Sequence, residues 1–109
     1  IIGVKMKRTL PFPIRSGLKK LGDALEKARL RRSLKMRVLA DRAGISLETL
    51  AKIKKGNPGV GMGKYAAVIF GLGFGVDWMS LASIENDTMG QMLDEEKMPK
   101  RVRDKKRGV

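Results

Sequence analysis

The chain has 109 residues, with 24 Lys and Arg against 11 Asp and Glu, so its formal net charge is +13. This length predicts one domain with a tail at either end, and no apolar run is long enough to span a bilayer. With neither Cys nor His in the chain, the commonest nucleophile, general base and zinc ligands are missing. We therefore expect no enzyme, no metal site and no cofactor, and the lack of cysteine fits a reducing, cytoplasmic setting.

The charge is unevenly distributed. Residues 1–34 carry ten basic and two acidic groups, and residues 35–65 carry seven and two. Residues 66–98 reverse the sign, with one basic and six acidic groups, and residues 99–109 return to six and one. Basic regions around an acidic segment indicate a polyanion-binding surface and a separate protein-facing region. An excess of solvated lysines is the alternative, but a pI near 10.5 in so short a chain favours nucleic acid.

The first predicted elements are an arm and a long helix. Pro11 and Pro13 remove backbone donors, so we expect an extended arm from Lys5 to Ile14. After Ser16, a candidate N-cap, apolar residues recur three and four apart, at Leu18, Leu21, Leu25 and Ala28. This spacing predicts a helix from about Gly17 to Ser33.

Two short helices follow in the predicted order. Apolar residues repeat at helical spacing from Met36 to Ala43, and Gly44 behind them favours a left-handed stop. Ser46 is placed to cap the next helix, which we expect to end at Gly56.

The remaining elements are also predicted to be helical. A fourth helix is expected from Met62 to Leu72, with Ala66, Ile69 and Phe70 facing inward. A fifth is expected near Val76 to Ala82, with Trp78 as its largest contribution to the core. Thr88 and Gln91 have the spacing of a capping box for a last helical turn or two. No convincing strand pattern is present, so the predicted class is all-α.

The second and third helices carry the functional signal, because a turn with glycine at its corner joins them. This is the layout of a helix-turn-helix, in which the second helix lies in the major groove of DNA. We expect Leu50 and Ile53 to face the core. The opposite face then carries Glu48, Lys52 and Lys55, one acceptor and two cations suited to base edges and phosphates. The alternative is an ordinary ion pair between Glu48 and Lys52 on a solvated face.

Three stretches around this turn have a specific pattern of small, apolar and glycine positions, namely 39–46 (LADRAGIS), 49–50 (TL) and 52–56 (KIKKG). With them, residues 18–82 resemble the lambda-repressor-like, XRE-type helix-turn-helix family. The resemblance implies a five-helix domain. The sequence itself adds an extended N-terminal arm and a short helical, basic C-terminal extension to the prediction. The chain departs from the family at Met36, where a phosphate-binding Gln is frequent, and at Leu47, where a polar base-reading residue is frequent. Leu47 either contacts a thymine methyl group or merely packs.

A narrower resemblance rests on residues 43–46 (AGIS), 56–60 (GNPGV), 63–66 (GKYA) and the ending 93–103 (LDEEKMPKRVR). In these segments the chain resembles HipB-type antitoxins. This resemblance implies a homodimer that represses its own operon at a palindromic double-stranded DNA operator and binds a HipA-type serine/threonine kinase toxin. The alternative for the tail is a disordered solubilising segment or an extra DNA-binding arm.

These observations predict a sequence-specific DNA-binding repressor in the cytoplasm, associated with the nucleoid. The alternatives are an XRE-family regulator unrelated to a toxin, such as a phage-type repressor, and a basic RNA-binding accessory protein. We expect an arm over residues 1–15, the DNA-binding domain over 16–84, and a partly disordered extension over 85–109. The candidate DNA-binding residues are Lys35, Met36, Arg37, Ser46, Leu47, Glu48, Thr49, Lys52, Lys55, Asn57 and Lys64.

Overall fold

The computed structural model describes residues 9–97, and within this range the regular elements are all helical. The expectation of an all-α protein is thus confirmed for the described residues. The contacts divide the chain into two units, with the boundary after Gly75. The first unit contains α1 to α4. The tail from Pro99 onward, predicted to be disordered, lies outside the described residues.

Helix α1 (Phe12–Arg31) begins earlier than the sequence predicts. Pro11 is its N-cap residue and Pro13 lies in its first turn, where the N–H groups have no partner within a helix anyway. The N–H groups of Ile14 and Arg15 donate to the carbonyl of Pro11, at 3.0 and 3.1 Å. The prediction of an extended arm was therefore wrong from Phe12 to Ile14, and Ser16 lies inside the helix, while residues 5–8 of the predicted arm lie outside the described residues.

All four helices of the first unit end in the same way. Helices α2 (Met36–Ala43), α3 (Leu47–Lys54) and α4 (Met62–Gly71) follow α1, and the residues with positive φ behind the four helices are Ser33, Gly44, Gly56 and Gly73. Each donates its N–H to the carbonyl three positions back, and the next residue donates to the carbonyl five positions back. This double closure satisfies carbonyls that a helix end leaves unpaired. The predicted stops at Gly44 and Gly56 are confirmed.

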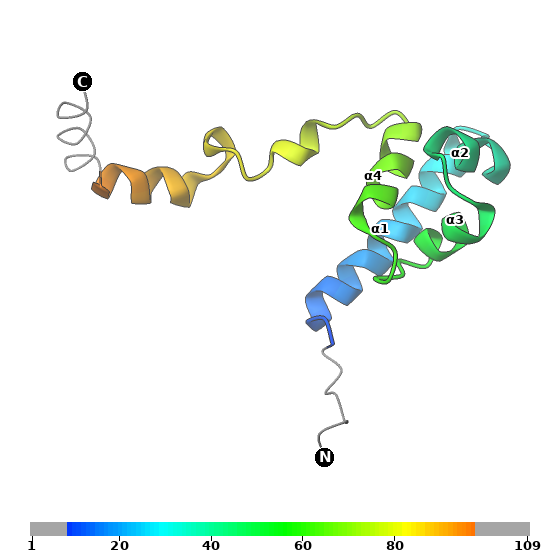
Figure 1. Cartoon of the computed structure of the whole chain (residues 1–109), viewed down its shortest axis with the longest axis horizontal. Helices are drawn as coiled ribbons and strands as arrows, with labels where there is room; N and C mark the ends of the chain where they lie inside the picture. The colour runs from blue at the N-terminus through cyan, green and yellow to red at the C-terminus, as the bar shows by residue number, and fades with distance from the viewer. Residues whose placement is uncertain (1–8, 98–109) are drawn as a thin grey trace, which may run out of the picture. The chain divides into compact units, whose positions relative to one another are not determined.

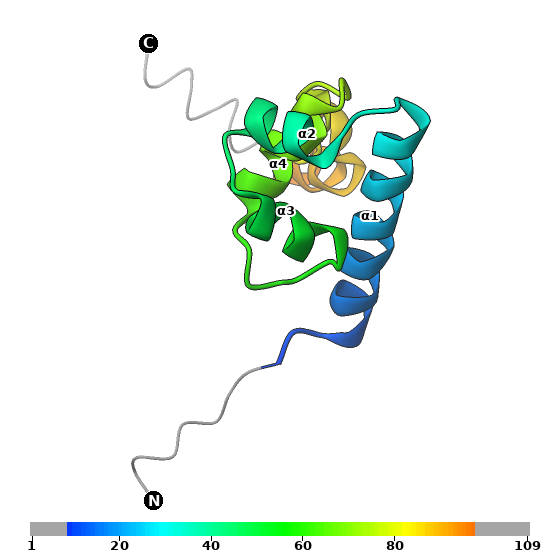
Figure 2. The same cartoon turned by 90° about the vertical axis from the view of Figure 1, so that its right-hand side faces the viewer.

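The core lies between the four helices. Helix α2 contacts α4 and α3, and α1 contacts α3. In Figures 1 and 2, α2, α3 and α4 gather beside α1, while the first turns of α1 project beyond them. The buried cluster consists of Leu25, Ala28, Leu39, Ala40, Leu50, Ile53, Tyr65, Val68 and Leu72.

The inward face of α4 differs in part from the prediction. Ala66 is buried and Ile69 packs against the core, but Phe70 is 62% exposed. The stripe that faces the core runs through Tyr65, Val68 and Leu72, and Phe70 points away from it. The sequence pattern was ambiguous because this helix is apolar on most of its circumference.

Two glycines let α1 and α3 approach closely. Gly22, in the middle of α1, is buried, and a Cβ atom there would overlap the carbonyl oxygens of Ile53 and Lys54. Gly56 has φ +71°, and a Cβ atom there would overlap the carbonyl of Leu18. The backbone of α1 therefore lies directly against the end of α3. Periodicity did not identify Gly22, because its role depends on a neighbour far away in the sequence.

The described part of the second unit, residues 76–97, has helical turns but no buried residues. It contains two 3-10 helices, η1 (Asp77–Ser80) and η2 (Ile84–Asn86), and a helix over 88–97. No residue between 76 and 97 is buried. The predicted fifth helix over 76–82 is thus only a 3-10 turn, and Trp78 is half-buried and does not belong to the core.

The cap of the helix over 88–97 was also predicted at the wrong residue. Asp87 caps it, because its carboxylate accepts the N–H of Gly90 at 2.9 Å. The side chain of Gln91 donates to the carbonyl of Ile84 at 2.6 Å and forms no capping box with Thr88. A carboxylate at the N-cap accepts the N–H that the hydroxyl was expected to accept, and it also suits the helix dipole.

Candidate nucleic-acid interface

The turn between α2 and α3 fixes how α3 is presented. Gly44 adopts φ +68° and ψ 33°, and Ile45 then packs against the core. The hydroxyl of Ser46 accepts the N–H of Thr49 at 3.0 Å, which confirms the predicted N-cap. A left-handed corner, an apolar anchor and a capped start together define the direction of the short helix α3.

Helix α3 has a buried side and a charged, exposed side. Leu50 and Ile53 are 2% and 0% exposed, while Glu48, Lys52 and Lys55 are exposed. The predicted division of the helix is therefore confirmed. Within the residues that the structure describes, Glu48 and Lys52 form no ion pair with each other. The outward row thus holds one carboxylate and two ammonium groups that do not pair as the alternative interpretation required.

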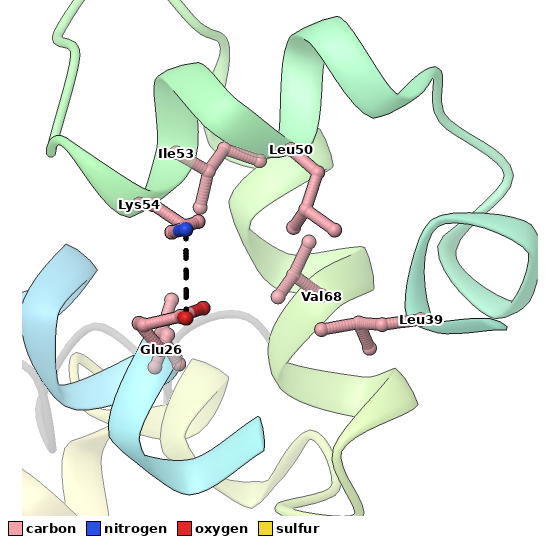
Figure 3. Close-up of a pocket in the computed structure, with 7 residues that line it drawn as sticks. Glu26, Leu39, Leu50, Ile53, Lys54 and Val68 are labelled. Carbon is pink, nitrogen blue, oxygen red and sulfur yellow. Dashed lines mark ion pairs between the residues drawn. The ribbon is translucent and has the colours of Figure 1, made fainter. Parts of the chain in front are cut away.

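Lys54, by contrast, points toward α1. Its Nζ lies 3.4 Å from the carboxylate of Glu26 (Figure 3). The same Nζ lies 3.9 Å from the sulfur of Met36. Arg29 pairs with the same carboxylate at 2.6 Å and also donates to the carbonyl of Leu34 at 2.6 Å. The hydrogen bond from Arg29 lowers the pKa of Glu26 below its usual value near 4.5, although burial opposes this change. This cluster fastens α3 and the loop after α1 to the body of the first unit.

The eleven candidate DNA-binding residues fall into two groups. Eight are exposed, namely Lys35, Arg37, Ser46, Leu47, Glu48, Lys52, Lys55 and Lys64. Three are half-buried, namely Met36, Thr49 and Asn57. Met36 packs against the core, so its side chain serves the fold.

Asn57 organises the loop between α3 and α4. Its side-chain oxygen accepts the N–H of Gly59 at 2.6 Å, and its backbone carbonyl accepts the hydroxyl of Tyr65 at 2.7 Å. The amide NH₂ of Asn57 has no hydrogen-bond partner within the part of the chain that the structure describes. Tyr65 was not predicted to matter, because its partner carbonyl could not be known from the sequence.

The N-termini of α2 and α4 carry no side-chain cap. Their N-cap residues are Lys35 and Gly61, and neither helix has an acidic residue in its first turn. The first N–H groups of a helix point outward without a helical partner and attract anions. Arg37 and Lys64 lie in these first turns and add positive charge there.

The two units differ in charge. Residues 9–75 contain fourteen basic and four acidic side chains, whereas residues 76–97 contain one and six. Some basic side chains of the first unit also have structural roles. Arg42 donates to the carbonyl of Gly71 at 3.4 Å, and Arg32 stacks 4.9 Å from the centre of the Phe74 ring.

The gap beside Glu26 and Lys54 is a packing defect of the core. It is lined mostly by the apolar side chains of Leu25, Leu39, Leu50, Ile53 and Val68 (Figure 3). Its volume is about 10 Å³, which is room for about one water molecule. Across residues 9–97, no group of three or more acidic side chains is arranged to hold a metal ion. Over the same range, no helix combines the length and apolar character needed to cross a bilayer.

Comparison with known proteins adds no relative. No protein-family model, no curated protein and no solved structure matches this chain. The function is therefore inferred from the residues of the chain and their geometry.

Proposed function

We propose that this protein is a sequence-specific DNA-binding repressor in which α2 and α3 form a helix-turn-helix of the lambda-repressor-like type. The observation that carries the proposal is the exposed row of Glu48, Lys52 and Lys55 on a short helix whose other side is buried. In this arrangement α3 enters the major groove, and Glu48 accepts a hydrogen bond from a base amino group.

Phosphate contacts flank the major-groove helix in this proposal. Lys52 and Lys55 lie on α3 and at its end, and Lys35 and Lys64 lie at the uncapped N-termini of α2 and α4. The amide NH₂ of Asn57 offers a neutral donor in the loop after α3. Such contacts set the register of a protein on the duplex and supply most of its non-specific affinity.

Binding of duplex DNA tests the proposal. The protein should select a single palindromic sequence from a random duplex pool, and structured RNA should not compete with it. Lys52→Ala or Lys55→Ala should weaken binding to every duplex and flatten the salt dependence by about one unit per lost phosphate contact. Lys27→Ala is the matched control, because it removes the same charge from an exposed pair with Asp23 on α1.

Equal competition by RNA and duplex DNA would favour the RNA-binding alternative. If no selected duplex binds more tightly than the random pool, the protein is not a sequence-specific repressor as proposed. Reduced binding by Lys27→Ala, equal to that of Lys52→Ala, would mean that net charge and not α3 governs the affinity.

The more specific part of the proposal is that the protein is a dimeric antitoxin that regulates its own operon and binds a HipA-type kinase. It rests on the resemblance of the short segments named above. Sedimentation at micromolar concentration should show a dimer with or without operator DNA, and a purified HipA-type kinase encoded beside it should join that dimer. A monomer under all conditions would contradict the assembly. A neighbourhood without a kinase gene would favour an XRE-family regulator unrelated to a toxin.

A further inference from the structure

Leu47 is an apolar side chain at the start of a charged helix face. It is the first residue of α3, and it is 47% exposed. It does not belong to the buried cluster or to the partly buried side chains that pack against it. The structure thus argues against one of the two roles that the sequence left open for this residue, packing in the core.

The polar neighbours of Leu47 are engaged with each other. The hydroxyl of Ser46 donates to the hydroxyl of Thr49 at 3.0 Å and accepts the N–H of the same residue at 3.0 Å. Its only proton is therefore used inside the turn. Ser46 then has no proton to donate to a base edge, and Leu47 and Glu48 are the exposed side chains of the first turn of α3.

The spacing on α3 places an apolar edge beside the charged row. Successive residues of a helix are roughly 100° apart, so Leu47 and Ala51 lie one above the other, next to Glu48. In the major groove, the only apolar group on a base edge is the C5 methyl of thymine. A half-exposed leucine side chain in the groove can contact this methyl group, but it cannot form a hydrogen bond with the polar base edges.

We propose that Leu47 is a specificity-determining residue that contacts a thymine methyl group once in each half-site. This inference rests on the proposed function, because it requires α3 to lie in the major groove. It implies a half-site that contains one thymine read by its methyl group, near a cytosine or adenine whose amino group donates a hydrogen bond to the carboxylate of Glu48.

Replacing thymine with deoxyuridine tests the inference, since the substitution removes one methyl group and preserves base pairing. In the duplex selected by the full chain, one symmetric pair of thymines should respond. Deoxyuridine there should weaken binding by roughly fourfold per half-site, the change expected for losing one buried methyl group. Deoxyuridine at the other thymines should leave the affinity unchanged.

Variants of Leu47 test whether its side chain causes the discrimination between thymine and deoxyuridine. With Leu47→Ala, the sensitive thymine and deoxyuridine should bind equally well, which is the coupling expected of a direct contact. Leu47→Met keeps an apolar side chain of similar size and should retain the discrimination. Unchanged helical circular dichroism of Leu47→Ala would confirm that the loss is local.

The failure of this inference differs from the failure of the proposed function. A protein that selects no duplex sequence would overturn both. A protein that selects an operator yet tolerates deoxyuridine everywhere would overturn only the role of Leu47. The same holds if Leu47→Ala keeps the full discrimination against deoxyuridine.

Discussion

Glu26 is a residue whose ionisation links stability to pH in the acidic range. The hydrogen bond from Arg29 lowers its pKa in the folded protein below the usual value near 4.5. A carboxyl group with a lowered folded pKa stabilises the fold above the unfolded pKa, and this contribution is lost as the pH falls through the folded pKa.

We therefore predict that Glu26→Gln lowers the free energy of unfolding at pH 7 and makes its decline below about pH 4.5 shallower. Urea unfolding from pH 7 to pH 3 measures both changes. Asp23→Asn is the control, because its pair with Lys27 has side chains that are 63% and 66% exposed, and exposed pairs contribute little. An equal effect of the two variants would contradict the special role of Glu26.

Ser33 is the one non-glycine residue with positive φ among residues 9–97. Its φ is +54°, at the end of α1 where the other three helices of the first unit have glycine. A side chain costs roughly 1–2 kcal/mol in this conformation, and glycine recovers part of that at the expense of unfolded-state entropy.

We predict that Ser33→Gly raises the free energy of unfolding by about 0.5–1 kcal/mol, measured by urea unfolding. Ser16→Gly, inside α1, should instead lower the free energy of unfolding by about 0.5 kcal/mol, because glycine is a poor helix former. Destabilisation by Ser33→Gly would show that the serine hydroxyl contributes more than the backbone strain costs.

At the scale of the element, α1 and α3 depend on each other through Gly22. Gly22→Ala should destabilise the protein by roughly 2 kcal/mol or more, because the new methyl group has no room against the backbone of α3. Gly17→Ala on the same helix meets no atom within 4 Å and should stabilise it by about 0.5–1 kcal/mol. Thermal unfolding of the two variants compares them directly, and parallel shifts would mean that the two helices are not in close contact.

A variant on the exposed face of α3 distinguishes the reading of bases from a general attraction to DNA, the two roles open to Glu48 under the proposed function. Glu48→Ala should cost about 1–3 kcal/mol on the operator and relax the preference at one position per half-site. If Glu48 contacts no base, removing its negative charge should tighten binding to all DNA with the preference unchanged. Affinities for operator and random duplex at two salt concentrations distinguish these outcomes, and uniform tightening would eliminate the base-reading role.

At the scale of the whole molecule, the two units should differ in local stability. All ten buried hydrophobic residues of the described chain lie in the first unit, and none lies between 76 and 97. Amide protons protected only by local hydrogen bonds exchange through small, frequent openings. We therefore predict that amides of 88–97 exchange orders of magnitude faster than those of Leu39, Leu50 and Ile53.

Hydrogen exchange at low protein concentration measures this difference. Equal protection of both units at every concentration would mean that the second unit has a core that its exposed side chains do not indicate. Protection that appears only as concentration rises would point to burial of residues 76–97 in the expected dimer.

The sequence alone determined the elements that depend on local interactions. Gly44 and Gly56 can adopt positive φ without steric cost, Ser46 caps the helix that it precedes, and the spacing of Leu50 and Ile53 defines a buried side. These preferences act within a few residues, so reasoning about neighbours in the sequence found them. The exposed row on α3 followed directly, as the other side of the same helix.

Tertiary structure decided what depends on distant partners. Gly22 is required because α3 lies against it, and Lys54 turns from the outward face because Glu26 is within 3.4 Å. Phe70 and Trp78 are as apolar as core residues, yet neither is buried. A side chain is buried only where another element packs over it. The sequence of one element does not specify which of its apolar faces will be covered.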